Sequence, residues 1–245
     1  MSSYLIFRGA GTEGSASVVG AANVLSNVYV NKMPDHKKAA MRQTEYHVKG
    51  RDGDLHVNEG YENFDLTVTL ILINATAATR QLVNAWADGT GKLITSDDLT
   101  KAYKATVAEE VEWNRLPGNG GFYDTATITF NCDPFMYEAV DTVLTLTASQ
   151  SILNPGSADA FPLIKVECTA NGSVEMTIAG SYIEIDGMVT NDPVYIDCAN
   201  GYIYTASGSA KEMTGNIPVF DLGTNAIVFG SNLAKLTITP HWRWV

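Results

Sequence analysis

Histidine is the first side chain to test for metal or acid–base chemistry, and this sequence has four of them. His47 and His56 fall on the two strands of a predicted hairpin and could share one face of it. Two imidazoles without an accompanying thiolate or carboxylate make a poor metal site. His36 and His241 belong to no HExxH or Cys–His arrangement. We therefore predict no metal site.

A glycine-rich segment, Gly89–Lys92, suggests a phosphate-binding loop. It lacks the first glycine of GxxxxGK[ST], and Leu93 stands where that motif needs a hydroxyl residue. The segment also follows a predicted helix and precedes a predicted strand, whereas a phosphate loop places its amides at the start of a helix. We predict a turn after a helix, and no bound cofactor.

Three carboxylates cluster at Glu109, Glu110 and Glu112, and paired carboxylates can hydrolyse glycosides. Alternation along a strand separates Glu109 from the other two. A solvated strand edge, whose charge discourages stray pairing, explains the cluster better than catalysis does. No GxSxG nucleophile elbow occurs. We predict that the chain is not an enzyme.

The C-terminal segment contains two tryptophans, Trp242 and Trp244, which share a face if the chain is extended. Exposed aromatic rings beside polar groups could form a platform for a sugar. A final core strand, or burial at a subunit contact, is the simpler explanation. The aromatic platform stays open as an alternative.

Charge limits the possible partners. Residues 1–138 carry 12 Lys/Arg and 17 Asp/Glu (−5), and residues 139–245 carry 4 and 10 (−6), which together give −11. Because a grip on nucleic acid needs clustered cations, we predict no specific DNA binding. No apolar stretch approaches the ~18 residues of a membrane span, and no secretory leader is recognisable. We expect a soluble protein made in a cytoplasm, with no membrane partner.

Cysteine usage indicates reduced thiols. The three residues, Cys132, Cys168 and Cys198, are widely spaced and include no CxxC pair. An odd count without such a pair favours buried thiols over disulfides or a zinc ribbon.

The first half predicts a mainly β domain with one helix. Residues 46–57 predict a hairpin around Asp52-Gly53, with Val48 opposite Val57. Residues 64–73 alternate as a long strand, and residues 75–87 have helical spacing, with Thr76 able to cap the helix. Further strands are predicted at 92–95, 103–107, 109–113 and 123–132.

Two segments of this half stand outside the strands. Asn31–Thr44 has no apolar period, so we predict a long exposed arm that could reach a neighbouring subunit; its cationic candidates for that contact are Lys32, Lys37, Lys38 and Arg42. Cys132-Asp133-Pro134 is expected to end the last strand, because proline cannot donate a ladder hydrogen bond. That break places a domain boundary after Glu138.

Residues 139–245 predict short strands at regular spacing without a helix. Asn200-Gly201 is a strong turn signal that would pair Cys198 with Ile203. This pattern indicates a two-sheet β-sandwich. The fold class is therefore mainly β, with two domains at 1–138 and 139–245.

Four short motifs follow one another in a fixed order along the chain. The first half contains Val48–Gly53 and, after the helix that bears Trp86, the strand end Ile128–Pro134. In the second half, Asn154-Pro155-Gly156 precedes Ala160–Ile164, and a late segment contains Pro218, Leu222, Gly223, Asn225 and Ile227. This order resembles the distal tail protein (Dit) family of siphophages, whose corresponding motifs are V-x-GRDG, I-x-F-x-C-x-P, N-x-G … P-x-I and FP-x-L-x-x-G-x-N-x-I. The late segment departs from the last motif, because Val219-Phe220 stand around the expected Phe-Pro.

The resemblance implies a structural virion protein at the distal tip of a phage tail. The first domain would be a belt that forms a ring of six copies, and the second a galectin-like β-sandwich outside it. The ring would join the tail tube protein to a tail fibre, a tail-associated lysin or other baseplate proteins, and DNA would pass through its lumen. We expect that lumen to be weakly acidic or neutral, because a basic lining would hold DNA.

A different class of function remains open beside the hub. A carbohydrate-binding or host-adhesion module of a tail tip is the alternative, and sugar binding would discriminate it from the hub. A hydrolase is a third hypothesis, but it would need an acid–base pair in a pocket, and none is visible in the sequence.

Overall fold

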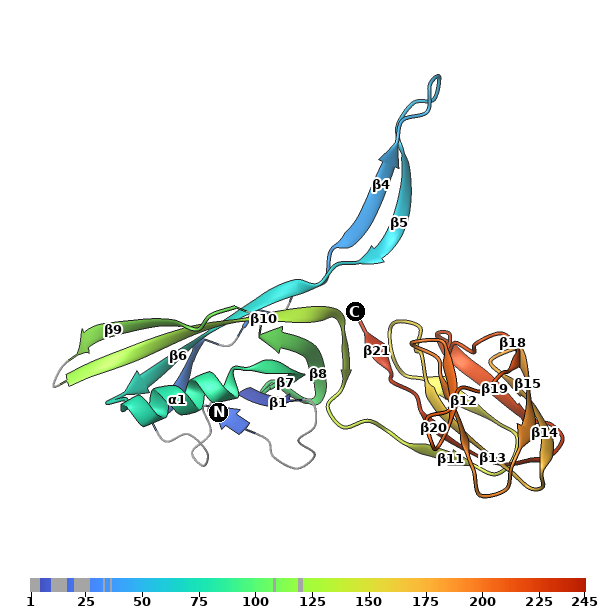
Figure 1. Cartoon of the computed structure of the whole chain (residues 1–245). Helices are drawn as coiled ribbons and strands as arrows, with labels where there is room; N and C mark the ends of the chain where they lie inside the picture. The colour runs from blue at the N-terminus through green and yellow to red at the C-terminus, as the bar shows by residue number, and fades with distance from the viewer. Residues whose placement is uncertain are drawn as a thin grey trace. The chain divides into compact units, whose positions relative to one another are not determined.

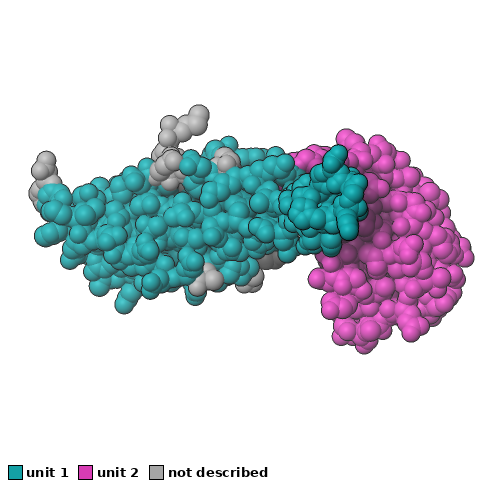
Figure 2. All heavy atoms as spheres, turned by 90° about the horizontal axis from the view of Figure 1, so that it is seen from above, with its two compact units in different colours: residues 1–139, 245 teal, residues 140–244 magenta. Residues whose placement is uncertain are grey.

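A computed structural model describes residues 5–9, 17–19, 27–32, 34–35, 37–107, 109–118 and 121–245. The chain divides into two compact units, Met1–Ala139 with Val245, and Val140–Trp244, shown in teal and magenta in Figure 2. This division falls beside the boundary predicted after Glu138. Each unit is described by itself below.

Unit 1 is built on one antiparallel sheet in the order β2-β1-β7-β8-β10-β6-β3, and β9 also pairs with β10. Its strands are β1 (Leu5–Gly9), β2 (Ser17–Val19), β3 (Val28–Lys32), β6 (Phe64–Ile73), β7 (Gly89–Thr95), β8 (Asp98–Val107), β9 (Glu112–Gly118) and β10 (Gly121–Glu138). The alternating apolar residues that predicted a strand at 64–73 bury one face of β6.

Strand β10 corrects the prediction of a break at Cys132-Asp133-Pro134. It runs unbroken through Pro134 to Glu138 and pairs with β6 along its first part and with β8 along its second. The register shifts between Cys132 and Met136. Proline is tolerated at such an irregularity because no regular ladder bond is required of it there.

One helix, α1 (Ala77–Trp86), covers the face of the sheet that carries the buried residues, as predicted (Figure 1). The Thr76 side chain accepts a hydrogen bond from the Thr79 amide at 3.1 Å and caps the first turn. The helix buries Val83 and Trp86. Trp86 meets Phe7 and Phe130 edge to face, so helix and sheet share one aromatic cluster.

A second sheet of unit 1 is a hairpin of two strands, β4 (Met41–Tyr46) and β5 (Leu55–Tyr61), which pair with each other and with no other strand among the described residues. We call residues 41–61 the arm. Figure 1 shows the arm projecting away from the start of β6. The predicted exposed segment Asn31–Thr44 overlaps its first strand, but the projecting element lies further along the chain; Met33 and His36 are outside the described residues.

Unit 2 has two five-stranded antiparallel sheets, in the orders β11-β20-β13-β16-β17 and β12-β19-β14-β15-β18. The first contains β11 (Leu144–Leu146), β13 (Leu163–Cys168), β16 (Val194–Asp197), β17 (Tyr202–Thr205) and β20 (Leu233–Thr239). The second contains β12 (Gln150–Asn154), β14 (Gly172–Ile178), β15 (Ser181–Met188), β18 (Thr214–Gly215) and β19 (Gly223–Phe229); a short strand β21 (Arg243–Trp244) follows.

One apolar core joins the two sheets of unit 2. Ile164 and Leu236 contribute from one sheet, and Met176 and Ile227 from the other, all at most 1% exposed. The predicted mainly β sandwich is confirmed. The sequence did not predict β12 or β18. It also placed the strands beside Asn200-Gly201 two residues out of register: Asp197 pairs with Tyr202, and its carboxylate accepts from the Ala199 and Asn200 amides.

Candidate functional site

The arm is exposed along almost its whole length. Cross-strand pairing sets Tyr46 opposite Leu55 and Thr44 opposite Val57, so these four side chains form a row on one face. Tyr46 is 52% exposed, Leu55 42% and Val57 43%. An isolated two-stranded hairpin is only marginally stable in water, and an exposed apolar row on it marks an interaction surface.

The tip of the arm differs from the predicted turn. The Arg51 amide donates to the Val48 carbonyl at 3.1 Å, and the strands begin pairing only at Tyr46 and Leu55. The predicted register, with Val48 opposite Val57, is therefore wrong by four residues. Because four is even, Leu55 and Val57 keep the face that the sequence assigned to them.

The two histidines of the arm each contact a different carboxylate. His47 pairs with Asp54 at the tip, and His56 Nδ1 lies 3.5 Å from a carboxylate oxygen of Glu45. Among the described residues, no group of three or more His, Cys, Asp or Glu side chains is placed to hold a metal ion.

The base of the arm is tied to the sheet by polar and aromatic contacts. Lys37 Nζ donates to the Asp65 carbonyl at 2.8 Å, and the Glu62 amide donates to the Ala40 carbonyl at 2.8 Å. Tyr61 meets Phe135 of β10 edge to face, 5.4 Å between ring centroids. These contacts fix where the arm leaves unit 1.

The four cationic candidates fall in different places. Lys32 lies in β3, and nothing is described of its side chain. Lys37 anchors the base of the arm, Lys38 is exposed nearby, and Arg42 is exposed on β4. The structure thus brings Lys37 and Arg42 to the arm, but the continuous surface there is the apolar row, which the cationic candidates did not indicate.

The outer face of the sheet in unit 1 carries a second exposed surface. Along β6 and β10, the residues that alternate with the buried core are half-buried or exposed. One part of this face is a shallow hollow of about 450 Å³, lined by Thr67, Thr127, Thr129, Glu109, Glu110 and Glu112. Glu112 opens β9, whereas Glu109 and Glu110 precede that strand, so the predicted strand 109–113 starts too early.

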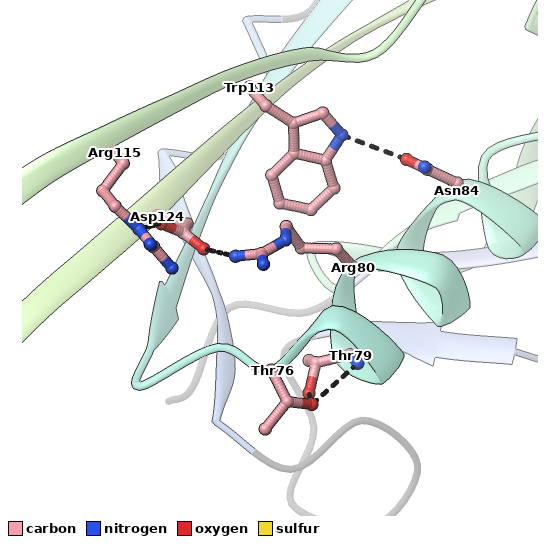
Figure 3. A network of polar contacts seen from close by, with 7 residues as sticks. All are labelled: Thr76, Thr79, Arg80, Asn84, Trp113, Arg115 and Asp124. Atoms are coloured by element: carbon pink, nitrogen blue, oxygen red, sulfur yellow. Dashed lines mark hydrogen bonds and ion pairs between the residues drawn. The ribbon is translucent and has the colours of Figure 1, made fainter.

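A buried carboxylate holds β9 and the helix together, as Figure 3 shows. The carboxylate of Asp124, on β10, forms ion pairs with the guanidinium groups of Arg80 on α1 at 2.5 Å and of Arg115 on β9 at 2.9 Å. Burial raises the pKa of Asp124, but the hydrogen bonds and charges of Arg115 and Arg80 outweigh it and hold the pKa below its usual range. This contact fixes the β9–β10 hairpin relative to the helix.

Two solved structures resemble this chain along nearly its whole length. The SPP1 Dit (gp 19.1) protein, described as a paradigm of hub adsorption apparatus in Gram-positive infecting phages, matches with a TM-score of 0.72 and 16% identity over 100% of both chains. The chain has the Dit fold. A chain of the phage P2 baseplate in its activated conformation with Ca matches the same fold with a TM-score of 0.52 and 11% identity over 97% of both chains.

The resemblance to distal tail proteins is thereby confirmed at the level of the fold. No protein-family model matches the sequence, and no curated protein matches it significantly. The short ordered motifs pointed to the Dit fold although overall identity is low.

Unit 2 of this Dit fold has an aromatic group on the outer face of one sheet, which the sequence reading did not single out. The rings of Tyr195 on β16 and Tyr204 on β17 stack with 5.3 Å between their centroids and 11° between their planes. Tyr202, also on the edge strand β17, is 67% exposed. Lys165, beside Tyr195, shares Glu167 with Lys235 at 2.6 Å each. A hollow of about 540 Å³ adjoins Lys165 and Glu167.

The two C-terminal tryptophans lie in the sandwich core. Trp242 is 3% exposed and packs on Phe220, 5.7 Å between ring centroids, and Trp244 packs half-buried against the same cluster. A sugar platform needs exposed ring faces, and Trp242 offers none. Its position agrees with the simpler expectation of domain closure.

The candidate phosphate loop and two of the cysteines lie in regular or buried parts of the fold. Gly89–Lys92 forms part of β7 after the helix, and not a loop at a helix start. Burial raises the pKa of Cys132 and of Cys198 to about 12, which keeps both thiols protonated and unreactive at neutral pH. No helix of the described chain is both long and apolar enough for a membrane span.

Proposed function

We propose that this chain is a structural hub protein of a siphophage tail tip. Six copies form a closed ring at the distal end of the tail, connect the tail tube to the baseplate, and leave a channel for DNA. The Dit fold over the whole chain carries this proposal, because the SPP1 Dit protein is described as a hub adsorption apparatus. The partners are the tail tube protein and a tail fibre, tail-associated lysin or other baseplate protein.

The two domains have different roles in this proposal. Residues 1–138 form the belt that closes the ring, and residues 139–245 form a galectin-like sandwich on its outside. The exposed arm supports the assignment of the belt, because a cyclic ring needs a heterologous contact between two different surfaces of each copy. The arm is one such surface.

The channel is proposed to be weakly acidic or neutral. Residues 1–138 have a formal charge of −5, so a wall built from them repels phosphate and lets DNA pass without specific binding. A ring structure with a continuous Lys/Arg lining would contradict this.

The mass of the purified native protein tests the ring. We expect a species of six 26.4-kDa subunits in native mass spectrometry, and ring-shaped particles with a central hole in electron micrographs. The ring should persist at moderate salt, because the exposed arm offers an apolar contact that salt does not screen. A monomer at every concentration, with and without tail tubes, would count against the hub.

The tyrosine group of unit 2 favours a second candidate function, carbohydrate binding at the host surface. Aromatic rings beside charged groups are typical of a saccharide site, and the charged groups Lys165 and Glu167 also line a hollow. This function would add an adhesive role to a tail-tip protein, and it moves the candidate platform from Trp242 and Trp244 to Tyr195, Tyr202 and Tyr204.

Titration with host cell-wall polysaccharide measures this candidate directly. If the site binds, Tyr202→Ala should weaken binding about tenfold, the loss of one good aromatic contact. Tyr182→Ala is the matched control, because Tyr182 is 48% exposed on the other sheet. Equal effects of both substitutions, or no binding by the unaltered protein, would remove the candidate.

A further inference from the structure

No element among the described residues of the same copy covers the apolar row of the arm. Tyr46, Leu55 and Val57 are each more than 40% exposed, and β4 and β5 pair with no other described strand. The opposite face of the arm carries polar side chains, among which Gln43 donates to Asn58 at 2.9 Å. The face of the row is apolar at Tyr46, Leu55 and Val57, and it ends at Glu59, whose carboxylate accepts from the Thr44 hydroxyl. The part of this face nearer the tip is therefore suited to an apolar partner, and the opposite face is suited to water.

A complementary apolar surface lies on the outer face of the unit 1 sheet. The register sets Leu116 beside Tyr123 and Tyr123 beside Ile73 across three strands, and Ile71 beside Tyr29 in the next row. Tyr29 is 49% exposed, Ile73 48% and Leu116 40%. We call this surface the stripe; it consists of Tyr29, Ile71, Ile73, Leu116 and Tyr123.

The arm and the stripe lie at opposite ends of β6. The arm enters β6 at Phe64, whereas the stripe is centred on Ile71 and Ile73 at the end of that strand. Nine steps of an extended strand separate these ends by ~30 Å. Two different surfaces at opposite ends of one element suit head-to-tail association, in which each copy gives one surface and receives the other.

We propose that the stripe of one copy receives the apolar row of a neighbouring copy's arm. Docking covers the exposed leucine, valine and isoleucine side chains of both surfaces, and the tyrosines at their margins keep their hydroxyl groups near water. The polar face of the arm stays outward. This inference rests on the proposed ring and names the surface that closes it.

A second copy is the occupant that the chemistry favours. The row and the stripe are both exposed apolar strand surfaces on the same chain, so each can bury the side chains of the other in a second copy. The stripe lacks the clustered cations that a nucleic acid would need, because it contains no charged residue.

Charge substitution on each surface tests the docking separately. We expect Leu55→Asp in the arm and Ile73→Asp in the stripe each to shift the native mass from six subunits to one. Val228→Asp is the matched control, because Val228 is 49% exposed on a strand of unit 2, and it should leave the ring intact. Circular dichroism and melting temperature confirm that each variant is folded before its mass is compared.

Mixing the two variants gives the sharpest readout. A Leu55→Asp copy keeps a working stripe, and an Ile73→Asp copy keeps a working arm. An equimolar mixture should therefore form a dimer of one copy of each and stop, because both remaining surfaces of that dimer carry the introduced charge.

Two results would overturn the docking while leaving the ring in place: an Ile73→Asp protein that still forms rings, or a mixture of folded variants that stays monomeric although the unaltered protein forms rings. A monomeric unaltered protein would instead contradict the proposed function. In that case, a photo-crosslinker at Tyr46 in a mixture of isotopically light and heavy copies decides the docking. Crosslinks between copies at the stripe support it, and their absence refutes it.

Discussion

Replacing Phe130 by alanine is expected to lower the free energy of unfolding of unit 1 by about 3–5 kcal/mol. Phe130 is fully buried, and its ring meets Phe7 at 5.3 Å and Trp86 at 5.9 Å between centroids. Truncation leaves a cavity where the sheet meets the helix and removes two edge-to-face contacts. Hydrogen exchange read by mass spectrometry should show lost protection in β6, β10 and α1, while the amides of unit 2 keep theirs.

Phe122→Ala is the matched control on the same strand. Phe122 is 60% exposed, and its ring contacts Arg115 at 5.7 Å, so its loss should cost no more than about 1 kcal/mol. Equal losses for the two substitutions would show that the aromatic cluster does not organise unit 1.

The aromatic cluster also shows what the sequence could predict. Period-2 alternation predicted strands through Phe64–Ile73 and 123–132, and helical spacing with Thr76 as cap predicted α1; all three follow from residues close together in the chain. The contacts among Phe7, Trp86 and Phe130 depend on the topology of the fold, because the three residues come from segments far apart in the chain. Local patterns cannot report such contacts.

Register was the least predictable feature of the hairpins. Asp52-Gly53 in the arm and Asn200-Gly201 in unit 2 are both strong two-residue turn signals, yet the strands pair further from each turn than predicted. In the second, the Asp197 carboxylate accepts from the Ala199 and Asn200 amides, which widens the loop. The faces assigned to Leu55 and Val57 survived because an even shift preserves them, but the first strand of the arm, Met41–Tyr46, lies mostly before the predicted hairpin.

The interaction surfaces were predicted only in part. The lack of apolar period before Thr44 predicts an exposed segment, but the lysines of that segment do not indicate the apolar row on Tyr46, Leu55 and Val57. Alternation in the arm resembles that of a half-buried strand, and only the structure shows that its apolar face is exposed and that no described strand pairs with the arm. A strand pattern predicts an apolar face, but not which molecule buries that face.

The asparagines of the family-like motifs have a physical role that the motifs alone did not reveal. Asn225 accepts from the Asp221 amide at 3.0 Å and donates to the Asp221 carbonyl at 2.9 Å, which closes the loop before β19. Asn154 likewise bonds to the backbone: its side-chain amide donates to the carbonyls of Ala158, Phe220 and Asp221 and accepts from the Gly156 amide. Buried amides that satisfy several loop carbonyls are costly to replace, since each orphaned group loses its partner.

Asn154→Asp is therefore expected to destabilise unit 2 by about 3–5 kcal/mol at neutral pH. Asn154 is 4% exposed; its amide nitrogen donates to the carbonyls of Ala158 at 3.1 Å and Phe220 at 3.2 Å, and its oxygen accepts from the Gly156 amide at 2.8 Å. A carboxylate of the same shape cannot donate, so it would bring negative charge against carbonyl oxygens. Urea denaturation at several pH values measures the loss.

The pH dependence separates a charge effect from a simple loss of fit. Burial beside carbonyl oxygens raises the pKa of the introduced carboxyl group in the folded state above its unfolded value of about 4. The penalty is then smallest below that value, where the carboxyl is protonated in both states, and it grows as the pH rises towards the folded-state pKa. Asn216→Asp makes the same chemical change at an exposed position of unit 2 and should alter stability by no more than about 0.5 kcal/mol. A loss at position 154 that did not change with pH would mean that packing, and not the lost donor and added charge, makes this asparagine necessary.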